Sequence, residues 1–140
     1  MLVGFADIRK TVGMDEPTYH GIIVNLSQKR KTLRELRIIG KRNVLFRFLV
    51  IYKIEVKQEE IDNLIIKIQH NMKRRLLLFA KEFYCHFYRN DELIIVFRER
   101  VFRASTQKAT WKEAIDYGKS IGIPAGQLDF IPNKMSDETY

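Results

Sequence analysis

The sequence has a single cysteine, Cys85, among its 140 residues. One thiol excludes an internal disulfide framework and any zinc site built from several cysteines, and it suits a reducing compartment. Glycine and proline are also scarce, with 7 and 3 residues, which excludes a collagen-like or low-complexity chain. The 46% of hydrophobic residues supply enough apolar material for one core, so we predict a single domain over residues 1–140.

Long hydrophobic runs are lacking as well. The most apolar stretch, residues 44–56, is interrupted by Arg47, Lys53 and Glu55. It is also shorter than the about 20 apolar residues that a membrane helix needs. The first ten residues do not have the basic segment and apolar run of a secretory signal. We therefore predict a cytoplasmic protein with no membrane partner.

Acidic residues are the minority charge. The chain has 25 Lys and Arg against 17 Asp and Glu, a net charge of +8. Residues 28–42 concentrate this excess, because Glu35 is their only acidic side chain. A local basic cluster is typical of polyanion-binding proteins, although solvated cations also serve solubility alone. The basic residues of this segment are Lys29, Arg30, Lys31, Arg34, Arg37, Lys41 and Arg42.

Residues 1–42 are expected to form a basic N-terminal extension of β or irregular structure. Residues 21–27 are rich in β-branched side chains and predict a strand. Thr32 and Glu35 have the spacing of a capping box, which predicts a short helix there. The alternative is a second strand that forms a hairpin with residues 21–27.

The pattern becomes clearer in the predicted core, residues 43–132. Hydrophobic residues alternate from Val44 to Glu55, which predicts one long strand. Residues 59–75 change to helical spacing, and the stripe on one face predicts an amphipathic helix. That stripe consists of Ile61, Leu64, Ile65, Ile68 and Met72.

The second half of the core predicts strands joined by tight turns, followed by a helix. Arg89-Asn90-Asp91 marks the first turn, and a second hairpin near Arg98-Glu99 is favoured over one unbroken strand. Gly122 and Pro124 mark the end of the last helix. The predicted elements are strands 83–88, 93–97 and 101–103, a helix over 110–121, a short strand over 128–131 and a frayed tail over 133–140.

This order predicts an α+β fold with an antiparallel-rich sheet and two helices packed on one face. One hairpin gives the ferredoxin-like βαββαβ order, and two hairpins give a related α/β sandwich. Leu45, Leu49 and Ile51 would then lie on the other face, where they are too apolar to remain bare. Either the N-terminal segment around Ile22 or a second copy of the chain should cover them.

Catalytic chemistry has little support in the sequence. Cys85 and His86 are neighbours on a predicted strand, so they point to opposite faces and cannot share a site. Cys85 is expected to pack beside Phe83 and Phe87. No acid–base pair is directed at a shared substrate, and no glycine-rich dinucleotide motif follows a strand. We predict no metal and no cofactor, and the sequence leaves enzymatic activity open while favouring a protein that is not an enzyme.

The leading hypothesis is a non-enzymatic nucleic-acid-binding module. The seven cations of residues 28–42 would neutralise phosphates, and aromatic side chains on a sheet can stack on unpaired bases. Tyr84 and Tyr88 project from one side of a predicted strand and would supply such rings. Arg98 and Arg100 follow on neighbouring strands and would hold further phosphates.

Two other functions compete with it. A homo-oligomeric interaction or scaffold domain would pair through the sheet face of Leu45, Leu49 and Ile51. A small-molecule enzyme or sensor would bind its ligand between the sheet and its N-terminal cover, in a deep pocket with a buried ionisable pair.

Overall fold

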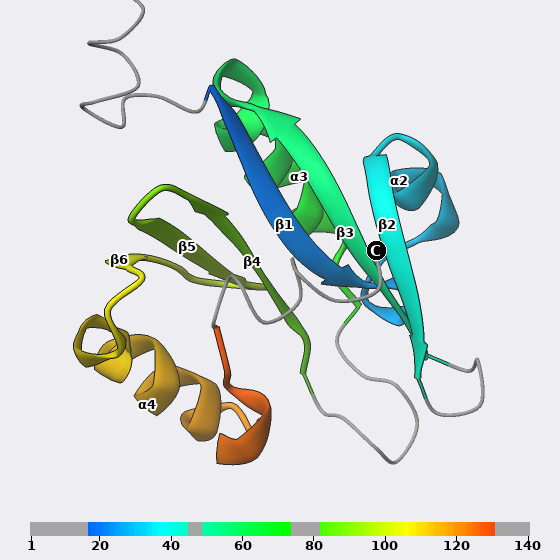
Figure 1. The fold of residues 1–140 in the computed structure, drawn as a ribbon. Coiled ribbons are helices and arrows are strands. Elements are labelled where there is room, and N and C mark those ends of the chain that lie inside the picture. Colours follow the sequence, from blue (N-terminus) through cyan, green and yellow to red (C-terminus); the bar gives the residue numbers. More distant parts are fainter. Residues whose placement is uncertain (1–16, 45–48, 74–81, 131–140) are drawn as a thin grey trace, which may run out of the picture.

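The computed structural model describes residues 17–44, 49–73 and 82–130, which form one six-stranded antiparallel sheet with helices (Figure 1). The fold is of the predicted α+β class. The strands follow the order β2-β3-β1-β4-β5-β6 across the sheet. They are β1 (Thr18–Val24), β2 (Arg37–Val44), β3 (Leu49–Lys57), β4 (Tyr84–Arg89), β5 (Glu92–Phe97) and β6 (Val101–Ser105).

Within the described residues, three α-helices accompany the sheet, and each is short. They are α2 (Arg30–Arg34), α3 (Ile61–Asn71) and α4 (Lys112–Ser120). Single 3-10 turns precede or follow them at Asn25–Ser27, Gln58–Glu60, Lys108–Trp111 and Ala125–Gln127. Within the described ranges, no helix is long and apolar enough to cross a membrane.

The segment around Ile22 is a strand of the sheet itself and does not cover its face. β1 lies between β3 and β4 and pairs with both in antiparallel register. Its central residues Ile22 and Ile23 are both buried, although they point to opposite faces of the sheet. The prediction that this segment covers the second face was therefore wrong. A strand that is apolar on both sides is stable only inside a sheet that is packed on both sides.

The predicted long strand over residues 44–55 is in fact the end of one strand and the start of another. β2 and β3 pair in antiparallel register, and Val44 lies opposite Leu49, so the chain reverses between them. Residues 45–48 carry no glycine, proline, asparagine or aspartate, the residues that usually mark a turn. The alternating pattern alone therefore concealed the reversal. Leu45 lies outside the described residues.

α3 connects two strands that are parallel to each other. β3 and β4 each pair antiparallel with β1, so the β3-α3-β4 unit has a third strand between its two strands. β4, β5 and β6 then follow as a meander with two hairpins, as favoured from the sequence. Residues 128–130 are not a strand, so the last strand of the βαββαβ order is not formed there.

The two longer helices cover opposite faces of the sheet, which corrects the prediction that both lie on one face. α3 packs through Ile61, Ile65 and Ile68 onto a core that includes Ile94 and Val96. The other core contains the α4 residue Ala114 and, from the same strand β5, Leu93, Ile95 and Phe97. β5 is thus buried on both faces, with each of residues 93–97 fully inaccessible to solvent.

Local signals at the ends of elements were partly correct. Asn90 adopts a φ of 52° in the β4–β5 turn, and Gly122 adopts a φ of 100° directly after α4. The N–H of Ile123 donates to the carbonyl of Gly118 at 2.9 Å, which is the helix end that a left-handed glycine permits. The predicted capping box does not form, because Thr32 lies inside α2 and the N-cap residue of that helix is Lys29.

The contact between β1 and β4 leaves no room for a side chain at Gly21. Gly21 and Phe87 are register partners, and a Cβ on Gly21 would lie 2.5 Å from Cδ1 of Phe87. Because Phe87 is fully buried, its ring cannot move aside without disturbing the core. The absence of a side chain at Gly21 is therefore required by the packing of β1 on β4.

We expect Gly21→Ala to lower the free energy of unfolding by about 1–3 kcal/mol, as overpacking of a filled core does. Urea denaturation monitored by circular dichroism measures this loss. Gly126→Ala is the matched control, because a Cβ there meets nothing within 4 Å, and it should change stability by less than about 0.5 kcal/mol. Equal stability of the two variants would contradict the packing argument.

Candidate functional site

α2 carries the densest group of exposed cations in the described chain. Lys29, Arg30, Lys31 and Arg34 are all exposed, whereas Thr32 is buried at 3% exposure. The segment before α2 is held against α3, because Gln28 Nε2 donates to the carbonyl of Ile68 at 3.1 Å. One side of α2 thus faces the protein and its cations face solvent.

Helix stability does not explain the cations at the start of α2. The N-terminus of a helix carries partial positive charge and favours acidic residues. α2 has no acidic residue in its first turn, and Lys29 is its N-cap residue with Arg30 next to it. Lys31 and Arg34 occupy the last turn, where the dipole favours cations. Lys29 and Arg30 therefore lie where a purely structural sequence would avoid them.

The cations of β2 divide between the two faces of the sheet. Lys41 lies opposite Tyr52, which packs against the α3 core, so Lys41 is on the same side of the sheet as α2. Arg37 and Arg42 lie opposite Glu55 and Ile51, on the α4 side. The predicted cluster of seven is therefore not one surface. The five that share the α3 side, here called the basic surface, are Lys29, Arg30, Lys31, Arg34 and Lys41.

Carboxylates neutralise little of the basic surface. Glu35, the only acid in residues 28–42, forms an ion pair with Lys67 of α3. Arg37 pairs with Glu55 at 3.5 Å, on the other side of the sheet. Within residues 17–44, 49–73 and 82–130, no cation of the basic surface forms an ion pair. Its charge is therefore available to a ligand.

Tyr84 and Tyr88 do not present their rings to solvent. The Tyr84 hydroxyl donates to the carbonyl of Gln127, and its ring meets that of Phe130 edge-on at 5.2 Å. Burial raises the pKa of Tyr84 to about 12. Tyr88 is only 9% exposed. In this structure neither ring is open to a nucleobase, because the chain after α4 covers Tyr84 and the rings of His20 and His86 lie beside Tyr88.

Arg98 and Arg100 lie at the β5–β6 hairpin, far from the basic surface. Arg98 is within 4.0 Å of Glu82 and 2.7 Å of Glu99, so carboxylates already balance its charge. Arg100 stacks over Phe102 at 4.5 Å. β6 and β2 are the two edges of the sheet, about 24 Å apart at the usual strand spacing. The structure does not bring these arginines together with α2.

The predicted oligomer interface is only partly within the described structure. Leu49 and Ile51 are half-buried, and Ile51 packs against the α4 core. Leu45 is outside the described residues. Pairing through this face remains a prediction that no observation of the structure favours.

Cys85 and His86 point to opposite faces of β4, as predicted. Cys85 is 1% exposed and packs in the α3 core with Phe83 and Phe87, and burial raises the pKa of its thiol. His86 is 4% exposed on the α4 side, and burial lowers the pKa of its imidazole to about 4. A buried thiol with a raised pKa is a poor nucleophile.

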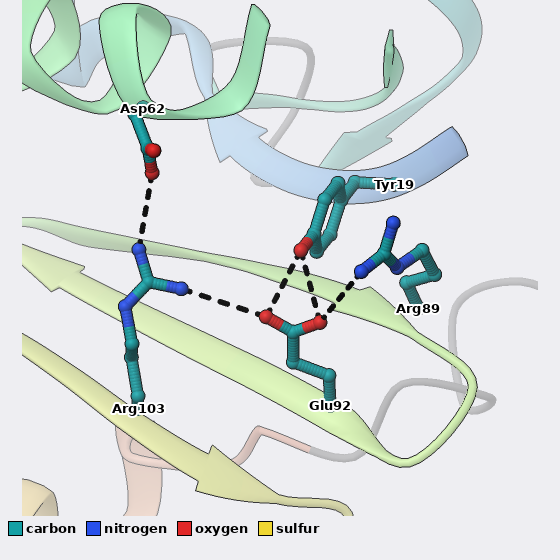
Figure 2. A network of polar contacts seen from close by, with 5 residues as sticks. All are labelled: Tyr19, Asp62, Arg89, Glu92 and Arg103. Atoms are coloured by element: carbon teal, nitrogen blue, oxygen red, sulfur yellow. Dashed lines mark hydrogen bonds and ion pairs between the residues drawn. The ribbon is translucent and has the colours of Figure 1, made fainter. Parts of the chain in front are cut away.

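A network of charged and polar side chains links β1, β4, β5, β6 and α3 (Figure 2). The carboxylate of Glu92 accepts a 2.9 Å hydrogen bond from the Tyr19 hydroxyl and a 3.1 Å bond from Arg89. Arg103 reaches both Glu92 and Asp62, at 3.5 and 3.1 Å. Burial, followed by the hydrogen bond to Glu92, raises the pKa of Tyr19.

No local sequence pattern indicates this network, because Tyr19 and Glu92 are 73 residues apart. Only the placement of β1 beside β4 brings them together. All five side chains already have partners within the network, which indicates a structural role.

A shallow pocket of about 260 Å³ opens between the end of α2, β3 and α3. Leu36, Val56 and Leu64 are among its apolar lining residues. The Glu35–Lys67 pair lies at the pocket with side chains 41% and 44% exposed, so it is not the buried ionisable pair expected of a small-molecule site. In the part of the chain that the structure describes, no group of acidic, histidine or cysteine side chains could hold a metal ion.

In comparisons with known proteins, no family model, no curated protein and no solved structure matches the chain.

We expect Glu92→Gln to lower the free energy of unfolding by about 1–2 kcal/mol. Two guanidinium groups would lose their shared anion, and charge-assisted hydrogen bonds contribute more than neutral ones. Denaturant titration measures the loss, and a double-mutant cycle with Tyr19→Phe measures the coupling between the two groups. Additive effects of the two substitutions would contradict a cooperative network.

Proposed function

We propose that the protein binds nucleic acid through the basic surface, by contacts to the phosphate backbone. The observation that carries this proposal is the group of exposed cations on α2 and Lys41, none of which pairs with a carboxylate in the described chain. Two of these cations lie at the helix end where they are least favourable for stability. A ligand with regularly spaced negative charges would offset that cost.

The chemistry of the basic surface favours phosphate recognition over base recognition. Lysine and arginine contacts to phosphate set affinity and orientation but carry no sequence information. The aromatic rings predicted to stack on bases are covered, so the proposal assigns them no role. We therefore expect weak, sequence-independent affinity, with a Kd of about 10⁻⁴–10⁻⁶ M at physiological salt.

The expected salt dependence is steep. If the five cations neutralise about five phosphates of duplex DNA, the logarithm of the affinity falls against the logarithm of the salt concentration with a slope near −4.5. Fluorescence anisotropy of a labelled duplex of about 20 base pairs measures this slope when the salt concentration is varied between about 50 and 200 mM.

The decisive variant is Arg30→Gln/Lys31→Gln/Arg34→Gln, which removes three charges from α2. Its salt dependence should become shallower, with a slope of about −1.8 in place of about −4.5. Its affinity in about 50 mM salt should decrease by at least about tenfold. The matched control is Lys57→Gln/Lys108→Gln/Lys119→Gln. These three lysines are also exposed and form no ion pair in the described structure, so the control lowers the net charge equally.

The control triple variant should retain most of the slope and affinity of the unmodified protein. Equal losses in both variants would mean that only net charge matters, and the basic surface would then not be a site. Absence of binding by the unmodified protein in 50 mM salt, or binding that salt does not weaken, would overturn the proposal.

A further inference from the structure

The chain after α4 forms a strap, residues 123–130, that lies on the α4 side of the sheet. Its apolar residues Ile123, Leu128 and Phe130 are buried in the same core as α4. Leu128 fills the space beside Gly118, where a Cβ would come within 2.6 Å of its side chain. The ring of Phe130 is fully buried.

Phe130 occupies a box of aromatic and imidazole rings. Its ring centroid lies 5.2 Å from Tyr84, 5.5 Å from Trp111 and 6.1 Å from His86, and each pair meets edge-on. Tyr84 and His86 come from β4, and Trp111 precedes α4. The box therefore joins the strap to both the sheet and the helix.

The strap is not one of the strands of the described sheet. Three of its N–H groups make local backbone hydrogen bonds, from Ile123 to Gly118, from Gln127 to Pro124 and from Leu128 to Ala125. Toward the sheet, the Tyr84 hydroxyl donates to the carbonyl of Gln127 and also has a hydrogen bond with the backbone of Asp129. Release of the strap would therefore break no bond of the strand ladder, which makes it a separate unit of local opening.

His86 is the group in the box that responds to acid. It is 4% exposed, and its Nε2 has no hydrogen-bond partner among the residues that the structure describes. A protonated imidazole has two N–H donors and a charge, and burial without partners disfavours it. Only an opened strap would let water reach the ring.

The charged and titratable neighbours of His86 do not compensate for burial. Asp129 of the strap favours the protonated form, but desolvation outweighs it. On β4, Tyr84 and Tyr88 are the neighbours on the same face, and on β1 the register partner is Ile22, with His20 two residues away. His20 is directed to Glu55, with Nε2 3.8 Å from the carboxylate. Lys53 lies beyond Ile22 in the same row.

We propose that the strap is an acid-released latch, in which protonation of His86 frees residues 123–130 from the sheet while the sheet and α3 remain folded. Release uncovers the box of Tyr84, His86 and Trp111 on the α4 side. The proposal does not depend on nucleic-acid binding, because the basic surface is on the other side of the sheet.

The direction of the pH effect follows from the two protonation states. Burial lowers the pKa of His86 from 6.5 to about 4, so the closed strap favours the neutral ring. The latch has its full stability above about pH 6.5 and loses it progressively as the pH falls toward 4. The opening equilibrium then shifts by up to about 300-fold, which is the factor that corresponds to that pKa difference.

Hydrogen exchange measured by mass spectrometry on the full chain tests the latch at pH values from 7.5 down to about 4. We expect amide protection in residues 123–130 to fall by about a hundredfold over this range, while β5 keeps its protection. Trp111 is the single tryptophan and lies against Phe130, so its fluorescence should follow the same transition. Simultaneous loss of protection in the strap and in β5 would indicate global acid unfolding and would overturn the proposal.

His86→Phe keeps a ring but removes the titrating group, and its strap should stay protected down to pH 4. His20→Gln is the control, because it removes the neighbouring histidine and should leave the transition unchanged. A strap in His86→Phe that opens like that of the unmodified protein would exclude His86 as the trigger. If that variant does not fold, an NMR titration of His86 in the unmodified protein decides, and an ordinary pKa near 6.5 would overturn the proposal.

Discussion

Burial of β5 on both faces is the constraint from which most of the architecture follows. Its five consecutive apolar residues, 93–97, alternate between the two faces of the sheet. Both faces of β5 must therefore be shielded from water. One layer of helix can cover only one face, so α3 and α4 must lie on opposite sides (Figure 1). The strap after α4 completes the second layer. Its bulky apolar residues fill the space that a nine-residue helix leaves over β4.

Polar interactions then hold the layers in register at positions where apolar packing would not. Glu92 begins β5, at the margin of the buried run, and joins Tyr19 of β1 to Arg89 and Arg103 on the strands beside it. Arg103 extends the link to Asp62 at the start of α3. Apolar contacts tolerate small slips between elements, whereas this set of hydrogen bonds accepts one arrangement only. The network therefore specifies how β1 and α3 sit on the meander.

Local patterns predicted most of the elements, and long-range pairing was the part that they did not determine. The helical stripe from Ile61 to Met72 and the turn at Asn90 depend on neighbours in sequence, so they were predicted. The position of β1 between β3 and β4 depends on contacts between residues 27 or more positions apart in the sequence. The run from Leu93 to Phe97 was interpreted as an ordinary strand, although an unbroken apolar run indicates burial on both faces. A strand buried on both faces requires a helix on each side of the sheet, which the prediction of two helices on one face does not provide. For the candidate site, the sequence indicates a cluster of cations around α2 but cannot show that β2 divides Arg37 and Arg42 from Lys41.

The sheet also separates two kinds of side chain that the sequence had combined into one binding site. The basic surface lies on the α3 side, at the β2 edge, whereas Tyr84 and Tyr88 lie on the α4 side of β4. A ligand bound to α2 cannot reach these rings through a packed sheet, and on their own side the strap covers Tyr84 while Tyr88 is only 9% exposed. Stacking and phosphate contact are therefore not two parts of one interface. Tyr84 packs against Phe130 and Tyr88 against His20 and His86, while the cations of α2 form no ion pair in the described part of the chain. This difference is why charge, and not aromatic surface, is the feature of this molecule that points to a ligand.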